Sequence, residues 1–296
     1  MTVKVVTDST SDIPAELAEE LGIRVVPIYV IFGQETYRDR VDMGTDEFFH
    51  KLVHNHVHPT TSVPSPKDFA DVYNELAGET DEIISIHLTS KESGTYNSAV
   101  LAKELVEKEC RIEVIDSQSL SMSLGMLVVA AARQAVAGAS LDQVAEFVRR
   151  SVPRLHLMIL VDTLKYVIKG GRLNKASGLV GTVLRVRPLL TLREGDLMPA
   201  GVARTKAKAV ERLYSFVKGF SRVKELAVAY TTEPEEAISL LSRLKALFPD
   251  ATSYLARVGP SLGTHAGPGA MGVAIWESEA EAYQVPGTEV AAVPDS

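Results

Sequence analysis

The fold is decided near the N-terminus, by the stretch VKVVTDSTSDIPAELAEELG at residues 3–22. Its first five residues are typical of a buried strand, and AELAEEL is typical of a helix that ends at Gly22. Between them, Ser11 or Asp12 is expected to cap the helix and Pro14 to lie in its first turn. A strand, a polar turn and a helix in this order indicate the first unit of a parallel α/β sheet.

The same alternation continues through the first half of the chain. Apolar runs rich in Val and Ile predict strands at 3–6, 23–31, 83–88 and 112–115. Patterns with a period of 3.6 residues predict helices at 45–54, 66–77, 94–108, 120–137 and 140–151. We therefore predict an N-terminal parallel-sheet α/β domain over residues 1–157.

The pattern changes after Pro153. The second half predicts strands at 156–162, 224–231, 252–258 and 270–277, helices at 163–169, near 175–184, 205–218 and 233–247, and a hairpin at 188–201 with its tip at Glu194–Asp196. This order is typical of a mixed α/β (α+β) domain, predicted over 158–280, with the boundary between domains inside 153–161. Residues 281–296 have no sustained period and are predicted to form a surface tail.

Composition narrows the class of protein. Apolar residues make up 46% and charged residues 23%, which is typical of a globular protein. The net charge of −7 argues against general nucleic-acid binding. Residues 162–208 nevertheless carry ten basic and three acidic residues, a net of +7, so the rest of the chain totals −14. A single cysteine, Cys110, and the lack of a leader or membrane-spanning run favour a cytoplasmic protein.

Hydroxyl side chains follow three of the predicted strands. They lie in Thr7–Asp12, Thr89–Thr95 and Asp116–Ser119. Because the carboxyl ends of parallel strands meet at one edge of a sheet, the three loops could line one crevice. For any single loop, capping of the following helix explains the polar side chains better than a binding site does. Only the three loops together favour a binding site.

Within these loops, no serine carries the pattern of a nucleophile. A G-x-S-x-G elbow and an S-x-x-K motif are both absent around Ser93. Ser93, Gly94 and Thr95 instead place hydroxyls and backbone N–H groups at a predicted helix start, which favours binding of a carboxylate or a phosphate.

Two further segments have alternative interpretations. The stretch HPTTSVPSP at 58–66 is expected to be stiff and extended, and it could present Thr61 and Ser62 to a ligand. From these residues alone, however, a connecting loop that caps the helix beginning at Pro66 is the preferred interpretation. The glycine-rich loop GPSLGTHAGPGA at 259–270 places His265 among glycines, as a turn residue or, as we favour, a donor to a ligand.

Motifs for a metal or a nucleotide are weak. His50 and His54 have the i, i+4 spacing of a helical metal pair, but no glutamate follows His50, so we predict no metal site. Gly267–Gly272 matches G-x-G-x-x-G, but the residues before it are not a strand and those after it predict a strand rather than a helix. No P-loop signature occurs.

Six blocks of the sequence together resemble the DegV family. They are TDSTSD at 7–12, TSVPSP at 61–66, SKESGTYNSA at 90–99, KGGRL at 169–173, RTKAKA at 204–209 and GTHAGPGAMGV at 263–273. The resemblance implies a two-domain α/β protein that binds a long-chain fatty acid, such as palmitate, in an apolar tunnel between its domains. It further implies a binding subunit of fatty acid kinase, with no catalytic residue and no cofactor of its own.

On this resemblance, the chain presents the fatty-acid carboxylate to a separate kinase subunit, which phosphorylates it to an acyl phosphate for phospholipid synthesis. Thr61 and Ser93 match the hydroxyls that hold the carboxylate, and His265 matches a histidine of that network. Ser62, Gly94 and Thr95 belong to the same two blocks and are assigned to the carboxylate site with them. Arg172 and Arg204 match basic positions near the head group that are linked to engagement of the kinase. Any contact with a membrane surface is expected to be transient.

The alternative is an enzyme, a hydrolase or a small phosphotransferase that uses the hydroxyl-rich crevice. It would require a serine paired with a base, and no such pair is visible in the sequence. A DNA-associated regulator ranks last, because the basic segment mixes helices with a hairpin instead of forming one recognition helix.

Overall fold

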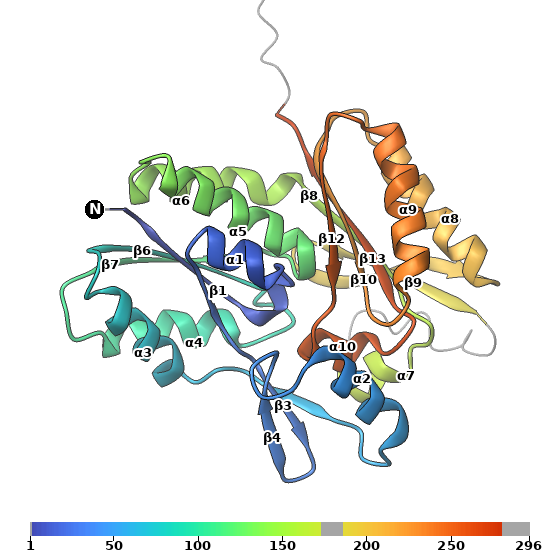
Figure 1. Cartoon of the computed structure of the whole chain (residues 1–296), viewed down its shortest axis with the longest axis horizontal. Coiled ribbons are helices and arrows are strands. Elements are labelled where there is room, and N and C mark those ends of the chain that lie inside the picture. Colours follow the sequence, from blue (N-terminus) through green and yellow to red (C-terminus); the bar gives the residue numbers. More distant parts are fainter. Residues whose placement is uncertain (1, 173–185, 280–296) are drawn as a thin grey trace, which may run out of the picture.

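The computed structural model describes residues 2–172 and 186–279. They form two large sheets, which lie side by side in Figure 1, and a small third sheet that projects beneath them. The predicted tail, and the helix predicted near 175–184, lie outside the described residues. The change from the first large sheet to the second occurs between β7 and β8, and the predicted domain limits remain a prediction.

The first sheet is parallel throughout, as the opening stretch predicts. Its order is β2 (Ile23–Val26), β1 (Lys4–Asp8), β6 (Glu82–His87) and β7 (Arg111–Asp116). Helices α3 (Pro66–Leu76) and α4 (Thr95–Ala102) cover one face. Helices α1 (Ala15–Glu20), α5 (Ser121–Val136) and α6 (Leu141–Ser151) pack against the other face. The result is a three-layer α/β/α arrangement.

The second sheet is mixed. Its order is β10 (Asp196–Ala203), β9 (Arg187–Arg193), β8 (Leu155–Leu160), β13 (Met271–Glu277), β11 (Val223–Tyr230) and β12 (Thr252–Arg257). Only β11 and β12 pair in parallel. Helices α8 (Lys206–Lys218) and α9 (Pro234–Leu247) cover its outer face. The predicted hairpin is confirmed, with positive φ at both Glu194 and Gly195, as a tight turn between twisted strands requires.

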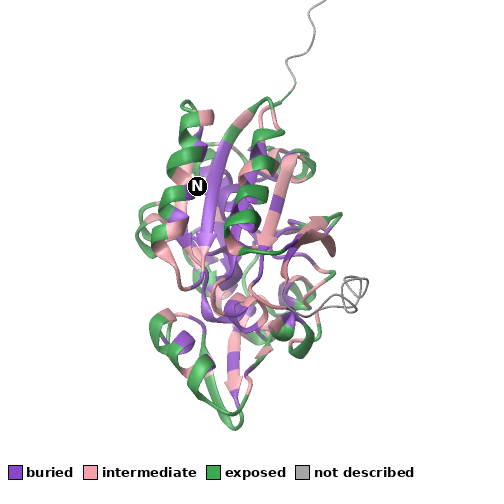
Figure 2. Ribbon diagram, turned by 90° about the vertical axis from the view of Figure 1, so that its right-hand side faces the viewer, coloured by how far each residue is buried: buried purple, intermediate pink, exposed green. Residues whose placement is uncertain are grey.

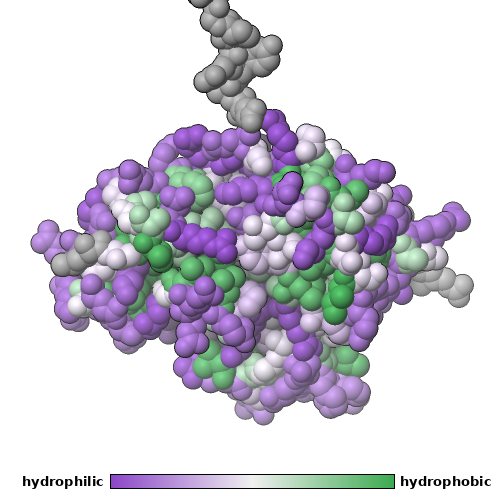
Figure 3. Space-filling model, turned by 45° about the horizontal axis from the view of Figure 1, so that its top comes forward, coloured by the Kyte–Doolittle hydropathy of each residue, from purple (hydrophilic) through white to green (hydrophobic). Residues whose placement is uncertain are grey.

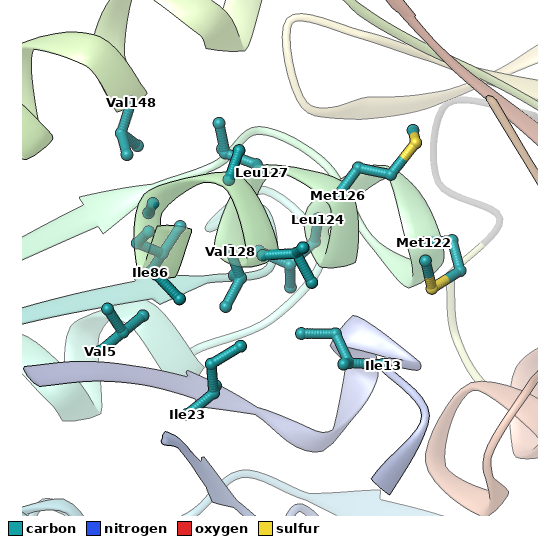
Figure 4. Packing of buried hydrophobic residues seen from close by; sticks show 14 of the residues in the cluster. Val5, Ile13, Ile23, Ile86, Met122, Leu124, Met126, Leu127, Val128 and Val148 are labelled. Atoms are coloured by element: carbon teal, nitrogen blue, oxygen red, sulfur yellow. The ribbon is translucent and has the colours of Figure 1, made fainter. Parts of the chain in front are cut away.

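Helix α5 joins the two sheets into one core. Thirteen of its sixteen residues are buried, so it is apolar on nearly every side. It contacts β1 and β6 of the first sheet and β8, β11 and β13 of the second. Figure 4 shows Leu124 and Val128 of this helix close to Ile86 and Ile13 of the N-terminal half. The two halves are therefore packed on a shared apolar helix.

A small antiparallel sheet was not predicted. It contains β4 (Glu35–Arg38), β3 (Tyr29–Phe32) and β5 (Thr60–Ser62), and α2 (Thr45–His54) packs on it. The single run predicted at 23–31 is divided because Pro27 has no N–H to continue a ladder, so β2 and β3 belong to different sheets. In Figure 2 this lower lobe is largely exposed or half-buried, with its buried residues inside.

Three other local predictions were wrong, each for a tertiary reason. Helix α1 begins at Ala15 after Pro14, because Asp12 bonds to distant groups instead of capping it; Ser11 lies in a 3-10 turn (Ser9–Ser11) capped by Asp8. Helix α4 ends at Ala102 and a 3-10 turn (Lys103–Leu105) follows, because the side chain of Asn74 bonds the backbone of Leu105 and Glu107.

The third error concerns the glycine-rich loop. It contains a short helix, α10 (Pro260–Ala266), which begins with proline in its first turn and ends at Gly267, where φ is +74°. This helix contacts α2, β3, β5 and α7 (Lys165–Lys169), so it lies where the three sheets meet. Another 3-10 turn (Val152–Arg154) precedes β8.

The hydropathy of the outer surface is mixed. On the face shown in Figure 3, hydrophilic residues predominate and hydrophobic residues occur in separate patches. Among the described residues, no helix combines the length and hydropathy needed to cross a membrane.

Candidate functional site

A deep pocket lies beneath α10, between the two large sheets. Its empty space amounts to about 1020 Å³, a figure that includes space open to solvent. Most of its wall is apolar and comes from both halves of the chain, with Leu88 and Leu120 on one side and Leu157, Leu190 and Val258 on the other. Such a wall suits an extended apolar ligand.

Four polar side chains that were predicted from the sequence line this pocket: Thr61, Ser93, His265 and Arg172. They come from β5, from the loop after β6, from α10 and from the end of α7. Thr61 Oγ1 lies 3.0 Å from His265 Nε2. The fold therefore brings together residues that are up to 204 positions apart in the chain.

Strand β5 explains why Thr61 and Ser62 differ. Thr61 pairs with Val30 of β3, and successive side chains of a strand point to opposite faces. Thr61 lines the pocket, whereas Ser62 is exposed and is not among the lining residues. The predicted stiff segment thus presents one hydroxyl to the pocket and not two.

His265 is held as a neutral ring. Burial, together with the nearby charges of Arg172 and His58, lowers the pKa of His265 to about 3. Its Nδ1 atom has no hydrogen-bond partner among the described residues and faces Gly170, where an added Cβ would clash with the imidazole. A proton on Nδ1 would therefore be buried without an acceptor, which is costly.

The favoured tautomer sets the direction of the hydrogen bond to Thr61. With the ring proton on Nε2, His265 donates to Thr61 Oγ1. The hydroxyl hydrogen of Thr61 is then available to a ligand. His265 acts in this arrangement by orienting the threonine, and it brings no positive charge to the pocket.

Ser93 is oriented in a similar way by its neighbour. The backbone N–H of Thr95 donates to Ser93 Oγ at 3.3 Å, and the two hydroxyl oxygens lie 2.9 Å apart. When the Thr95 hydroxyl also donates to Ser93, the Ser93 hydroxyl can donate into the pocket. Thr95 is fully buried, and neither Thr95 nor Gly94 lines the pocket. Both residues support Ser93 at the start of α4.

The two predicted arginines occupy different places. Arg172 lines the pocket and donates to the backbone oxygens of Gly170 (2.6 Å) and Glu92 (3.4 Å). Arg204 is exposed, follows the end of β10 and is not among the lining residues. Arg204 lies seven positions along extended chain from the lining residue Leu197, which corresponds to roughly 20 Å.

A serine, a histidine and an aspartate do form a relay elsewhere, and no sequence motif had indicated it. Ser85 Oγ lies 2.7 Å from His87 Nε2, and His87 Nδ1 lies 2.9 Å from Asp8 Oδ2. Tyr73 donates to Ser85 Oγ at 2.8 Å. All four side chains are buried with 0% exposure and none lines the pocket, so no substrate reaches Ser85. The relay stabilises β1 and β6 and gives no support to a hydrolase.

Two of the three hydroxyl-rich loops line the pocket, and the third leads to it. Thr10 comes from the loop after β1, Ser93 from the loop after β6, and Ser121 lies just beyond the loop after β7. Sequence reasoning named the loops but missed Ser121 and also Ser261 of α10, because each lies at the start of a helix, where serine is common. The apolar lining was missed because it has the same composition as a core.

Metal ligands are not grouped in the described part of the chain, where no three His, Cys, Asp or Glu side chains lie close enough to hold an ion. The rings of His50 and His54 stack with their centroids 4.3 Å apart. His54 Nδ1 lies 2.8 Å from the carbonyl oxygen of His50, so that nitrogen is a donor in this helix and not a ligand.

The fold and the pocket define a two-domain α/β protein with a site for an amphipathic small molecule. The chain belongs to the DegV family: the family model described as "Uncharacterised protein, DegV family" matches residues 2–278. A DegV domain-containing protein of Caldanaerobacter subterraneus is 37% identical over 92% of this chain and 97% of its own length. Protein DegV of Bacillus subtilis is 32% identical over 92% of this chain and 98% of its own.

Solved structures show the same arrangement. A DegV family protein from Thermus thermophilus, described by its fatty acid binding, has a TM-score of 0.85 at 34% identity and covers 94% of this chain and 100% of its own. DegV from Bacillus subtilis, described as a fatty acid binding protein, has a TM-score of 0.86 at 30% identity with the same coverage. These neighbours confirm the predicted family and the predicted fold class.

Proposed function

We propose that this protein binds a long-chain fatty acid, with the acyl chain in the apolar pocket and the carboxylate at Thr61 and Ser93. The observation that carries the proposal is the composition of the pocket wall, which is mostly apolar and includes Thr61, Ser93, His265 and Arg172 among its polar residues. The fatty acid binding of the Thermus thermophilus and Bacillus subtilis relatives supports it.

Simple energetics are consistent with tight binding. Each buried CH₂ group contributes about 0.8 kcal/mol, so ten of them contribute about 8 kcal/mol before the costs of binding. The acyl chain supplies the affinity, and the polar groups prevent the carboxylate from being buried without donors.

In this proposal the ligand carboxylate is held mainly by hydrogen-bond donors and not by one positively charged side chain. The hydroxyls of Thr61 and Ser93 can each donate one hydrogen bond, and Arg172 adds positive charge at the same end. His265 holds Thr61 in the donating orientation. No side chain in this group acts as a nucleophile in the proposal.

We further propose that the chain is the non-catalytic binding subunit of a fatty acid kinase in the cytoplasm. The bound carboxylate oxygen attacks the γ-phosphorus of ATP held by the separate kinase subunit. A bond forms between that oxygen and phosphorus, the bond to the β-phosphate oxygen breaks, and ADP leaves with an acyl phosphate as product, which serves phospholipid synthesis. Thr61, Ser93 and Arg172 are only half-buried, so a partner can approach this end of the pocket.

In this scheme the two arginines have separate roles. Arg172, at the pocket, stabilises the charge that the head group gains on phosphorylation. Arg204, exposed at the end of β10, contacts the kinase subunit. Replacing Arg204 with Ala is therefore expected to leave fatty acid affinity unchanged and to lower the rate of phosphorylation by a reconstituted kinase subunit.

The experiment for the binding proposal is native mass spectrometry of gently purified protein, followed by titration of the delipidated protein with palmitate. We expect a co-purifying mass in the range of long-chain fatty acids and one palmitate site per chain. Absence of such a mass in repeated preparations, with no uptake of added palmitate, would refute it. Failure of phosphorylation alone, with palmitate bound, would remove the kinase role and keep the lipid site.

A further inference from the structure

The pocket contains a second polar group of side chains, away from the carboxylate site. Thr10, Ser121 and Ser261 all line the pocket, and their exposed fractions are only 2%, 5% and 2%. They come from the 3-10 turn after β1 and from the first residues of α5 and α10, and the 3-10 turn packs against both helices. We call these three residues the hydroxyl subsite.

Two buried carboxylates hold this group in place. Ser121 Oγ donates to Asp12 Oδ2 at 2.6 Å, and the N–H of Gly259 donates to Asp12 Oδ1 at 2.9 Å. The N–H of Ser261 donates to Asp39 Oδ2 at 3.3 Å. Because Asp12 and Asp39 are themselves joined to Arg40 and Ser9, the hydroxyl subsite is fixed by a connected network.

The subsite has unused capacity to accept hydrogen bonds. Thr10 and Ser121 spend their hydroxyl hydrogens on Asp8 and Asp12, so the remaining lone pairs of their oxygens face the pocket without a donor. Ser261 Oγ has no hydrogen bond of good geometry among the described residues, but it lies close enough to Asp39 to donate its hydrogen there, which leaves its lone pairs to accept from a ligand. A plain acyl chain beside these oxygens would leave them unsatisfied, which is unfavourable in a buried site.

The carboxylates around the hydroxyl subsite favour a ligand group that is uncharged and can donate a hydrogen bond. Asp8, Asp12 and Asp39 all lie directly behind the three hydroxyls, with Arg40 as the cation bonded to Asp12. A second carboxylate or a phosphate has no hydrogen to donate and would be repelled by these side chains. An alcohol on the ligand has the required hydrogen and no charge.

We infer that the hydroxyl subsite recognises a hydroxyl group on the acyl chain, so that the protein accepts hydroxy fatty acids as well as plain ones. This inference rests on the proposed fatty acid binding and adds a ligand class to it. Ser261 lies one helical turn before His265 on α10, about 6 Å along the helix. The hydroxyl is therefore expected on the half of the chain nearer the carboxyl group.

The test compares stearate with a series of monohydroxystearates that carry the hydroxyl at successive positions, titrated into the delipidated full-length protein in competition with a fluorescent fatty acid. We expect one or two adjacent positional isomers to bind as tightly as stearate or more tightly. The other isomers should bind about tenfold more weakly, because their hydroxyl is buried against an apolar wall. If every isomer binds at least tenfold more weakly than stearate, the inference is wrong.

Two serine variants locate the effect. Ser261→Ala should weaken the favoured isomer about tenfold and leave stearate within twofold. Ser123→Ala is the matched control, because Ser123 is also a buried serine of this region without a hydrogen bond of good geometry among the described residues, but it does not line the pocket. It should change neither ligand. Equal affinity of the Ser261 variant and the wild type for the favoured isomer would overturn the assignment.

A crystal structure of the wild type with the favoured isomer keeps the inference testable should a variant fail to fold. Its ligand hydroxyl is expected within about 3 Å of Ser261 Oγ. A water molecule at that position, with the ligand hydroxyl elsewhere, would contradict it. Failure of stearate itself to bind would instead refute the proposed function, so the two failures are distinguishable.

Discussion

His87 and His265 are both largely buried, and each lies beside a hydroxyl side chain, but the two networks differ in completeness. Both ring nitrogens of His87 have partners, Ser85 and Asp8, and Tyr73 completes the chain. His265 has one partner, Thr61, and the hydroxyl of that threonine faces a pocket. The network with a spare donor at a cavity is the one suited to a ligand.

This comparison shows that catalytic-looking geometry is not enough to identify a site. Ser85, His87 and Asp8 have the residue types and distances of a nucleophilic triad, but they are sealed in the core beneath Phe69. Thr61, His265 and Ser93 resemble no catalytic motif, but a ligand can reach them. Access and unused hydrogen-bonding capacity separate the two groups better than residue type.

The largest expected effect comes from breaking the sealed network. His87→Ala removes the ring that bonds to Asp8 Oδ2 and leaves a buried carboxylate with fewer donors, at a cost of about 3–5 kcal/mol in the free energy of unfolding. Urea unfolding followed by circular dichroism measures it. The control is His156→Ala, whose ion pair with Glu277 is partly exposed and should contribute less than about 1 kcal/mol. Similar losses of unfolding free energy in both variants would show that the buried network of His87 is no more important for stability than an exposed contact.

A second prediction concerns Gly170, whose backbone lies against the imidazole ring of His265. Gly170→Ala places a methyl group against the imidazole ring, so His265 must move away from Thr61 and palmitate affinity should fall about tenfold or more. Gly94→Ala is a close control. Gly94 has nearly the same backbone angles (φ −77°, ψ 2°, against −76° and −4°), and its added Cβ would meet only Val63 at an ordinary 3.9 Å.

Calorimetric titration with palmitate distinguishes the two glycine variants. The Gly94 variant is expected to bind like the wild type. A strong loss in that variant would show instead that the ligand approaches the backbone at Gly94, which is assigned to the carboxylate site from the sequence.

A third prediction compares neighbours on β5. Thr61→Val keeps the shape of the side chain and removes the donor, so affinity for palmitate should fall by about tenfold. Ser62→Ala should have no effect, because Ser62 is exposed on the opposite side of the strand. The same titration tests both, and a loss for Ser62→Ala equal to that for Thr61→Val would contradict the orientation of the strand.

The smallest effect is a dependence of stability on pH. The pKa of His265 is about 3 in the folded protein and near 6.5 in the unfolded chain, so below pH 6.5 only the unfolded chain takes up this proton. Stability therefore falls as the pH is lowered. Between pH 7 and pH 5.5 the wild type should lose about 1 kcal/mol of unfolding free energy relative to His265→Gln. A parallel pH dependence in the two proteins would show that His265 titrates normally.

The sequence predicted the fold class well because the governing signals are local. The strand and helix of residues 3–22 and the Glu194–Gly195 turn are specified by short patterns, and both are confirmed. It failed where a distant side chain decides the local structure. Asn74 ends the helix at Ala102, and the partners of Asp12 prevent it from capping α1.

The candidate site was predictable only in part, for a related reason. Thr61, Ser93 and His265 lie in distinctive motifs, and the family resemblance assigns all three to one site. Ser121 and Ser261 have no such signal, because a serine at a helix start is common and only the pocket gives it meaning. The hydroxyl direction of Thr61 depends on Gly170, which is 95 residues from His265 in the chain and touches it only in three dimensions.

The central claim is that the carboxylate of a fatty acid binds at the hydroxyls of Thr61 and Ser93. A crystal structure of the delipidated protein soaked with palmitate tests it most directly. We predict carboxylate oxygens within about 3 Å of Thr61 Oγ1 and Ser93 Oγ, with the acyl chain between the two large sheets. A carboxylate at Thr10, Ser121 and Ser261, or palmitate bound outside the pocket, would contradict the account.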